Sequence, residues 1–186
     1  GIHDSRSFHS RLQNRYRFRA IWKADDGGLK MDCPPLLVYR IGHFLHRIGL
    51  ARIALLISWL NRILFATWIP SSCHIGKRVK VGYWGLGVVI HSRSYVGDEC
   101  IIAQNVTLGR KEGGEGVPTI ESGVYIGSGA SVLGDVRVGR DAVVGANSVV
   151  LTSVPDGAVV AGVPARFIRN RNEDETVEWR KRINEK

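Results

Sequence analysis

The sequence predicts a mainly β fold, a solenoid of short strands preceded by an α-helical segment. Between Ile90 and Val154 a branched aliphatic residue returns at every sixth position, apart from one glycine-rich interruption. A small or β-branched residue stands four positions after each of these aliphatic residues except Leu108, which precedes the interruption. The stretch from Leu36 to Phe65 is apolar with a helical spacing. The first two observations predict the solenoid, and the third predicts the helices.

The repeat does not fit ordinary secondary structure. An amphipathic helix repeats at about 3.6 residues and a half-buried strand at about 2, so neither explains a period of six. Such a period indicates a solenoid, in which each strand buries its apolar side chain by stacking on neighbouring copies. Three repeats make one triangular coil, with the aliphatic residue inside and glycine or a small residue at the corner. The inward positions are Ile90, Val96, Ile102, Leu108, Ile120, Ile126, Val132, Val138, Val144 and Val150, and in the first coil Ile75 and Val81.

Four segments resemble a known family in order. They are Gly-Val-Val-Ile at 87–90, Ile-Ile-Ala-Gln-Asn-Val-Thr-Leu-Gly at 101–109, the stretch 118–130, and Val-Val-Ala-Gly-Val-Pro-Ala-Arg at 159–166, of which 161–166 is the most specific part. Together they resemble the hexapeptide-repeat acyltransferases, in their serine acetyltransferase-like branch. The resemblance covers residues 69–169 and implies a left-handed parallel β-helix. It also implies a homotrimer that uses acetyl-CoA as a co-substrate, with its sites at subunit interfaces.

The length of 186 residues predicts one domain with appended segments. We expect a basic arm at 1–30, a helical segment at 31–68, the β-helix at 69–169 and a charged tail at 170–186, which can form a short helix. Met31 is the only methionine. One hypothesis is therefore that the native chain starts there and that residues 1–30 are non-native; a natural basic arm is the alternative.

The net charge of +9 does not point to nucleic acid. The basic residues are scattered and are not interleaved with aromatic residues, and no zinc-finger or RNA-stacking motif is present. An anionic ligand or an anionic membrane surface explains the charge equally well. The cysteines are odd in number, none stands in a CxxC motif, and no signal peptide is recognisable, which predicts a reduced, cytoplasmic protein: Cys33, Cys73 and Cys100.

The helical stretch divides at Gly49 into two predicted helices. Arg52 and Arg62 bracket its apolar run, which is therefore shorter than the roughly 18 residues that a membrane span requires. Two interpretations remain open. The helices can pack on the β-helix or on a neighbouring subunit, or they can hold the protein peripherally at the inner membrane face, because basic residues flank an apolar surface that includes Trp59.

Two interruptions of the repeat are predicted to leave the solenoid wall. Val81 and Ile90 are nine positions apart, so the intervening Gly-Tyr-Trp-Gly-Leu-Gly at 82–87 should bulge. The glycine-rich, charged segment 110–116 should form an extruded loop. Loops on a rigid scaffold are common binding elements, and the resemblance places the bulge beside the acceptor site.

Acetyl transfer from a thioester to a hydroxyl requires a base, donors for the oxyanion and a slot for coenzyme A. The resemblance implies a coenzyme A groove formed by Gly127, Gly129, Ala130, Gly145, Ala146, Ala161, Gly162, Pro164, Ala165 and Arg166, with Arg166 and Arg169 placed to meet phosphates. Contacts with the acceptor or thioester are expected from Trp84, Gln104 and Asn105.

The base departs from the family pattern. At the positions that match the two family histidines, this chain has Trp84 and Val117. His91 follows an inward position near the bulge and is the predicted replacement, whereas His74 is less well placed. Carboxylates that can orient the imidazole are Asp98, Glu99 and Glu121. The sequence shows no metal cluster and no activated nucleophile, which favours direct transfer.

Other functions remain open. The acceptor hydroxyl can belong to serine or to a sugar or polysaccharide precursor. The missing histidines also allow a catalytically silent trimeric scaffold that keeps coenzyme A or partner binding. A metal-dependent hydratase of the carbonic anhydrase type needs three histidines, and only His74 and His91 lie in the coils.

Overall fold

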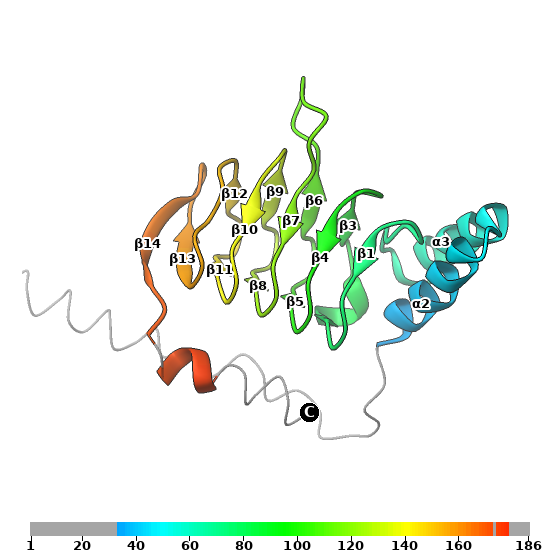
Figure 1. The fold of residues 1–186 in the computed structure, drawn as a ribbon, viewed down its shortest axis with the longest axis horizontal. Coiled ribbons are helices and arrows are strands. Elements are labelled where there is room, and N and C mark those ends of the chain that lie inside the picture. The colour runs from blue at the N-terminus through cyan, green and yellow to red at the C-terminus, as the bar shows by residue number, and fades with distance from the viewer. Residues whose placement is uncertain (1–32, 173, 179–186) are drawn as a thin grey trace, which may run out of the picture. The chain divides into compact units, whose positions relative to one another are not determined.

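The computed structural model describes residues 33–172 and 174–178. Figure 1 shows two helices followed by a solenoid of short strands. The expectations for residues 1–30, including a start at Met31, lie outside the described residues. The elements are α2 (Pro34–Arg47), α3 (Ala51–Phe65), β1 (His74–Ile75), β2 (Lys80–Val81), a 3-10 turn η1 (Gly82–Gly85), β3 (Val89–Ile90), β4 (Tyr95–Val96), β5 (Ile101–Ile102), β6 (Thr107–Gly109), β7 (Thr119–Ile120), β8 (Tyr125–Ile126), β9 (Ser131–Leu133), β10 (Arg137–Val138), β11 (Val143–Val144), β12 (Val149–Val150), β13 (Ala158–Ala161) and β14 (Arg166–Asn170).

The strands form three sheets, one for each side of the coil. Their orders are β1-β4-β7-β10, β2-β5-β8-β11-β13-β14 and β3-β6-β9-β12. The pairings are parallel except for β14, which runs antiparallel to β13. Each strand therefore pairs with the strand one full coil later, as the predicted parallel β-solenoid requires.

Two edges of the solenoid matter for function. The loop edge joins the β3 sheet to the β4 sheet and comprises the turns 91–94, 110–118, 134–136 and 151–153. The glycine edge joins the β5 sheet to the β6 sheet and comprises 82–88, 103–106, 127–130, 145–148 and 161–165. A third edge comprises 76–79, 97–100, 121–124 and 139–142.

The predicted core is confirmed. All ten inward positions between Ile90 and Val150 are at most 1% exposed. The residues four positions later are buried as well: Ser94, Cys100, Val106, Val124, Ala130, Val136, Ala142, Ser148 and Val154. The interior of the solenoid is thus a column of stacked branched side chains, closely packed as in other protein cores.

Glycine after an inward residue allows successive coils to approach closely. A Cβ built on Gly127 would lie 2.5 Å from the Ala146 backbone nitrogen. Because backbone cannot move aside like a flexible side chain, we expect Gly127→Ala to destabilise the fold by about 1–3 kcal/mol. A thermal melt should show a Tm lower by roughly 2–4 °C for each kcal/mol.

The matched control is Gly114→Ala, because the nearest atom to a Cβ there is the Lys111 carbonyl oxygen at 3.6 Å. An equal fall in Tm for both variants would show that coil spacing is not the reason for glycine at 127.

The two predicted helices are confirmed, with their break at 48–50, where Gly49 has a φ of +89°. Helix α3 ends at Phe65, and the next residue, Ala66, adopts a left-handed backbone conformation. No helix in the described part of the chain combines the length and apolarity needed to cross a membrane. The helices instead pair with each other and lie at the N-terminal end of the solenoid (Figure 1).

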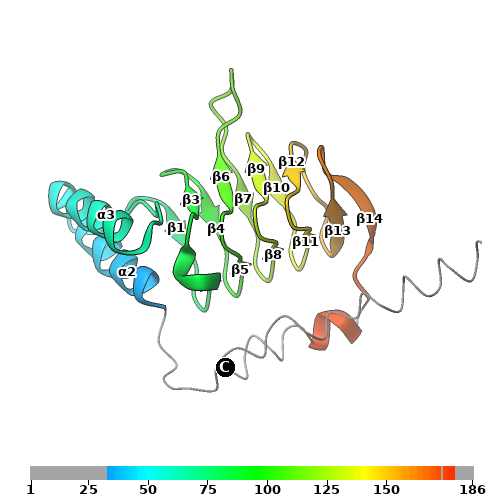
Figure 2. The same ribbon diagram turned by 180° about the vertical axis from the view of Figure 1, so that it is seen from behind.

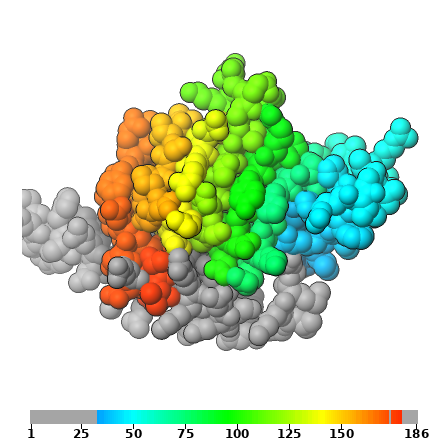
Figure 3. All heavy atoms as spheres, viewed as in Figure 1, coloured from blue at the N-terminus to red at the C-terminus, as the bar shows by residue number. Residues whose placement is uncertain are grey.

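Both predicted departures from the wall are confirmed. In the bulge, Tyr83 and Trp84 have left-handed φ values and exposed side chains. Segment 110–116 projects as a loop between β6 and β7, as the view from behind and the space-filling view show (Figures 2 and 3). In the tail, residues 174–178 are helical.

Candidate active site

His91 lies on the loop edge. Strand β3 ends at Ile90, and the backbone N–H of His91 donates to the Leu108 carbonyl oxygen at 2.8 Å. Leu108 belongs to β6, from which the 110–116 loop leaves the wall. The β-pairing therefore holds His91 at the base of the extruded loop, a contact between segments that are far apart in the chain.

Two arginines accompany His91. The backbone N–H of Arg93 donates to His91 Nδ1 at 3.2 Å, and the Arg93 guanidinium donates to the Glu115 carbonyl oxygen. Arg110 Nη1 lies 3.3 Å from Glu115 Oε2. Glu115 thus connects the loop to the turn that carries His91. Sequence reasoning missed these three residues, although the charges of the loop and the arginine two positions after His91 were visible.

The surroundings lower the pKa of His91. Desolvation is the largest cause, followed by the positive charges of Arg110 and Arg93, and Glu115 opposes them. The imidazole is therefore neutral at neutral pH, as a general base must be. The contact from Arg93 assigns the ring hydrogen to Nε2. If His91 is the base, it accepts a hydroxyl proton at Nδ1 in place of the Arg93 contact, or at Nε2 after the tautomer changes.

The charge of Arg110 yields a prediction for the pH profile. If neutral His91 is the base, activity falls as the pH drops through its pKa, which lies below the ordinary value of about 6.5. Arg110→Ala removes one cause of the lowering, so the acidic limb of kcat/KM should move to higher pH. Lys111→Ala, on the same loop, is the control. A profile of Arg110→Ala that overlays the wild type would contradict this role for Arg110.

The carboxylates expected to orient an imidazole are bonded elsewhere, on the third edge. Asp98 Oδ1 accepts from the Lys77 N–H at 2.7 Å, Glu99 pairs with Arg78, and Glu121 lies 3.0 Å from Arg137 Nε. His74 stacks on Tyr95 with ring centroids 4.5 Å apart. The orienting contact that the structure gives His91 is the Arg93 N–H.

The expected groove and acceptor residues share the glycine edge. Backbone bonds run along it from coil to coil: Asn105 N to Leu86 O at 2.8 Å, Gly129 N to Gln104 O at 3.0 Å, Asn147 N to Ser128 O at 2.8 Å, and Val149 N to Gly162 O at 3.0 Å. The expected residues that lie on this edge, or at the adjoining ends of β13 and β14, are Trp84, Gln104, Asn105, Gly127, Gly129, Ala130, Gly145, Ala146, Ala161, Gly162, Pro164, Ala165 and Arg166.

Within a single chain, His91 does not lie on the glycine edge. His91 follows β3, whereas Gln104 follows β5, and these strands belong to different sheets. The sheet containing β3 and β6 separates the two edges. A site that uses both His91 and the glycine edge therefore needs the loop edge of one copy beside the glycine edge of another.

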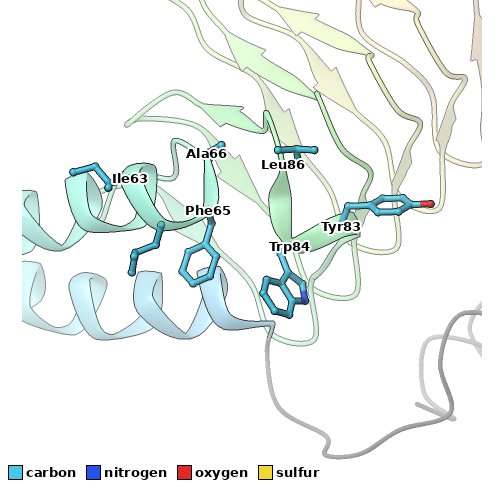
Figure 4. Close-up of a pocket in the computed structure, with 7 residues that line it drawn as sticks. Ile63, Phe65, Ala66, Tyr83, Trp84 and Leu86 are labelled. Atoms are coloured by element: carbon cyan, nitrogen blue, oxygen red, sulfur yellow. The ribbon is translucent and has the colours of Figure 1, made fainter.

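An open apolar cleft of about 570 Å³ lies where the bulge meets the end of α3. The rings of Phe65 and Trp84 meet edge to face, with centroids 6.1 Å apart. Figure 4 shows both rings in the cleft between the helix and the bulge. The remaining lining residues are Ile63, Leu64, Ala66, Tyr83 and Leu86. The sequence indicated the bulge but not its apolar partners from the helix.

The buried thiols are unsuited to nucleophilic catalysis. Burial raises the pKa values of Cys73 and Cys100 to about 12, so both are protonated at neutral pH. Among the described residues, no group of three or more His, Cys, Asp or Glu side chains is placed to hold a metal ion.

Comparison with known proteins agrees with the repeat and the fold. The family model described as bacterial transferase hexapeptide (six repeats) matches residues 118–152. Serine acetyltransferase of Synechococcus elongatus is 38% identical over 161 residues, which cover 81% of this chain and 66% of that protein. The chain belongs to the hexapeptide-repeat transferases. The serine acetyltransferase of Escherichia coli is 38% identical to this transferase over 75% of the chain and 51% of its own length.

The solved structures to which this hexapeptide-repeat transferase is similar are also serine acetyltransferases. Serine acetyltransferase from Brucella abortus in complex with coenzyme A has a TM-score of 0.71 and 34% identity, and covers 74% of this chain and 55% of that one. Soybean serine acetyltransferase complexed with serine has a TM-score of 0.69 and 35% identity, over 72% and 56%. The chain thus spans about half to two thirds of the length of the relatives it matches.

Proposed function

We propose that this transferase moves an acetyl group from acetyl-CoA directly to a hydroxyl, as a homotrimer with its sites between subunits. The observation that carries the proposal is the row of expected groove residues along one edge of the solenoid, from the bulge to Arg166. The serine acetyltransferase relatives and the coenzyme A complex among them support the reaction class. The separate location of His91 supports sites shared between copies.

The glycine edge suits a long, flexible thioester. Ala146, Asn147 and Gly162 are exposed there, so a pantetheine arm can lie against the backbone without large side chains in its path. Arg166, at the start of the exposed strand β14, can meet the phosphates. Arg169 bonds to Glu175 at 2.8 Å and would exchange that partner for a phosphate.

The reaction needs a single proton acceptor. The hydroxyl oxygen attacks the thioester carbonyl carbon while His91 takes the hydroxyl proton. When the tetrahedral intermediate collapses, the carbon–sulfur bond breaks and the proton passes from His91 to the departing thiolate. The products are an acetyl ester and coenzyme A. The protonated, buried cysteines favour this direct route over an acyl-enzyme.

Serine is the acceptor that the relatives suggest, since one of them is solved with serine bound. A sugar hydroxyl is the second candidate, and the bulge favours it. Trp84 is 59% exposed and shares an apolar cleft with Phe65 and Leu86. An apolar surface of this kind suits the uncharged face of a sugar ring better than the two charges of serine, whose desolvation is costly.

The test is thiol release from acetyl-CoA with a panel of acceptors that contains serine and sugars. Turnover with any acceptor supports acetyl transfer, and the preferred acceptor decides between the two candidates. Coenzyme A binding without turnover of any member would favour the silent scaffold. Absence of both binding and turnover would overturn the proposal.

A further inference from the structure

The hairpin of α2 and α3 presents its large apolar side chains away from the solenoid. On α2, the exposed stripe consists of Leu37, Ile41, Phe44 and Ile48. On α3, Leu56 is 67% and Ile63 77% exposed, and Ile53, Leu55, Trp59, Leu60 and Leu64 are exposed as well. Among residues 33–172 and 174–178, Trp68 touches one edge of this surface through Trp59, with ring centroids 5.4 Å apart, and Ile63 and Leu64 border the cleft of the bulge. The rest of the surface is left exposed. An apolar surface of this extent on a folded chain marks an interaction site.

The opposite face of the hairpin is attached through the buried Leu36 and Tyr39, which join the core of the solenoid, and through several hydrogen bonds. Tyr39 donates its hydroxyl to the Cys73 carbonyl oxygen at 2.8 Å, and Arg40 donates to the Ile75 and Gly76 carbonyl oxygens. Between α3 and the first coil, Ser58 Oγ lies 2.8 Å from Ser71 Oγ. The solenoid therefore holds one face of the hairpin through buried apolar and polar contacts, and the apolar stripe on the other face stays exposed.

The charged Arg residues in the hairpin are not accompanied by acidic residues. From residue 33 to residue 97 the sequence contains no Asp or Glu. The hairpin carries the exposed arginines Arg47, Arg52 and Arg62. An exposed apolar helix face flanked only by cations is the pattern of a helix that lies in the interface of an anionic membrane.

We propose that the α2–α3 hairpin docks on an anionic lipid surface. The apolar stripes enter the boundary between headgroups and acyl chains, and the arginines contact lipid phosphates. Neither helix is long enough to cross the bilayer, so the hairpin lies on it. A second copy of the hairpin is less suited to cover this surface. It would bring the same three arginines close together, and the hairpin has no acidic residue to pair with them.

The test is co-sedimentation of the full chain with two kinds of vesicle, phosphatidylcholine alone and phosphatidylcholine with phosphatidylglycerol. We expect binding to the anionic vesicles, weakened by high salt. The triple change Arg47→Gln, Arg52→Gln, Arg62→Gln should weaken it about fivefold for each arginine removed, or about 100-fold in total. The double change Leu56→Gln, Ile63→Gln should weaken it at least as much, since it removes the apolar contact.

Matched controls come from the C-terminal half of the chain, away from the hairpin in the sequence. Ile168→Gln and Arg140→Gln change an exposed apolar residue and an exposed arginine there, and both should bind like the wild type. Far-UV circular dichroism checks that each variant is folded. Sedimentation without lipid reports self-association of the same variants.

Each other outcome overturns the proposal. If the folded wild type does not bind anionic vesicles, a lipid surface is not what covers the hairpin. Equal binding to neutral and anionic vesicles shows that the arginines do not select the surface. A smaller solution mass for Leu56→Gln, Ile63→Gln, without vesicle binding by the wild type, assigns the hairpin to a second copy.

Discussion

Replacing His91 with alanine is expected to lower kcat by about 10²–10⁴-fold, the usual contribution of a general base. The affinity for acetyl-CoA should change little, because the imidazole takes the acceptor's proton and the expected groove residues are left unchanged. His91 is the histidine at the base of the extruded loop, its pKa is lowered, and two arginines lie beside it. Thiol release gives kcat, and a titration with coenzyme A gives the affinity.

His74→Ala is the matched control, because His74 also lies on the coils but stacks on Tyr95 within one sheet. It should keep most of the activity. If His91→Ala turns over like the wild type, another group accepts the proton and the region around Trp84 becomes the first place to search. If both variants lose activity together with their fold, by circular dichroism, the comparison must move to the milder His91→Gln.

Ile102→Ala is expected to destabilise the fold by about 2–5 kcal/mol, the range for truncating a buried aliphatic side chain. Ile102 is 0% exposed, and its strand pairs with the strands of the preceding and following coils through Val81 and Ile126. A cavity there interrupts the stacked column, and the neighbouring coils are held by backbone pairing, so they can relax only in part. Denaturant unfolding at a constant subunit concentration measures the change.

Ile101 provides the control, since it is the same residue type one position earlier and points out of the wall, partly exposed. Ile101→Ala should cost clearly less than Ile102→Ala, because part of the Ile101 side chain is already exposed and solvent can fill the space that it leaves. Equal losses at the two positions would mean that the inward and outward sides of the strand contribute alike, contrary to the stacked-column account.

Much of the fold could be predicted because the repeat is a direct consequence of coil geometry. A residue that points inward must be apolar and of nearly constant size, so Ile90, Val96 and Ile102 recur at fixed spacing. The extruded loop was predictable for the same reason, since a glycine-rich charged segment cannot serve as wall. The alignment of Gln104, Gly127 and Gly145 on one edge follows from the same period.

The surroundings of His91 could not be predicted. Arg93 is close in sequence, but Arg110 and Glu115 reach the turn only because β6 pairs with β3 and the loop folds back. The six-residue repeat predicts the course of the backbone within the coils. The conformation of an extruded loop depends instead on side-chain contacts, which the repeat does not encode.

The sequence by itself determined the solenoid, its inward residues, the two helices and the two departures from the wall, because each is a local pattern of apolarity, glycine and charge. Only the tertiary structure decided that His91 and the glycine edge lie apart on one chain, and that the hairpin turns its apolar stripe outward. An amphipathic pattern indicates that one face of a helix is apolar, but it does not indicate what packs against that face. The first coil buries Leu36 and Tyr39 in its core and accepts hydrogen bonds from Tyr39 and Arg40. It therefore contacts this face of the hairpin and leaves most of the apolar stripe exposed.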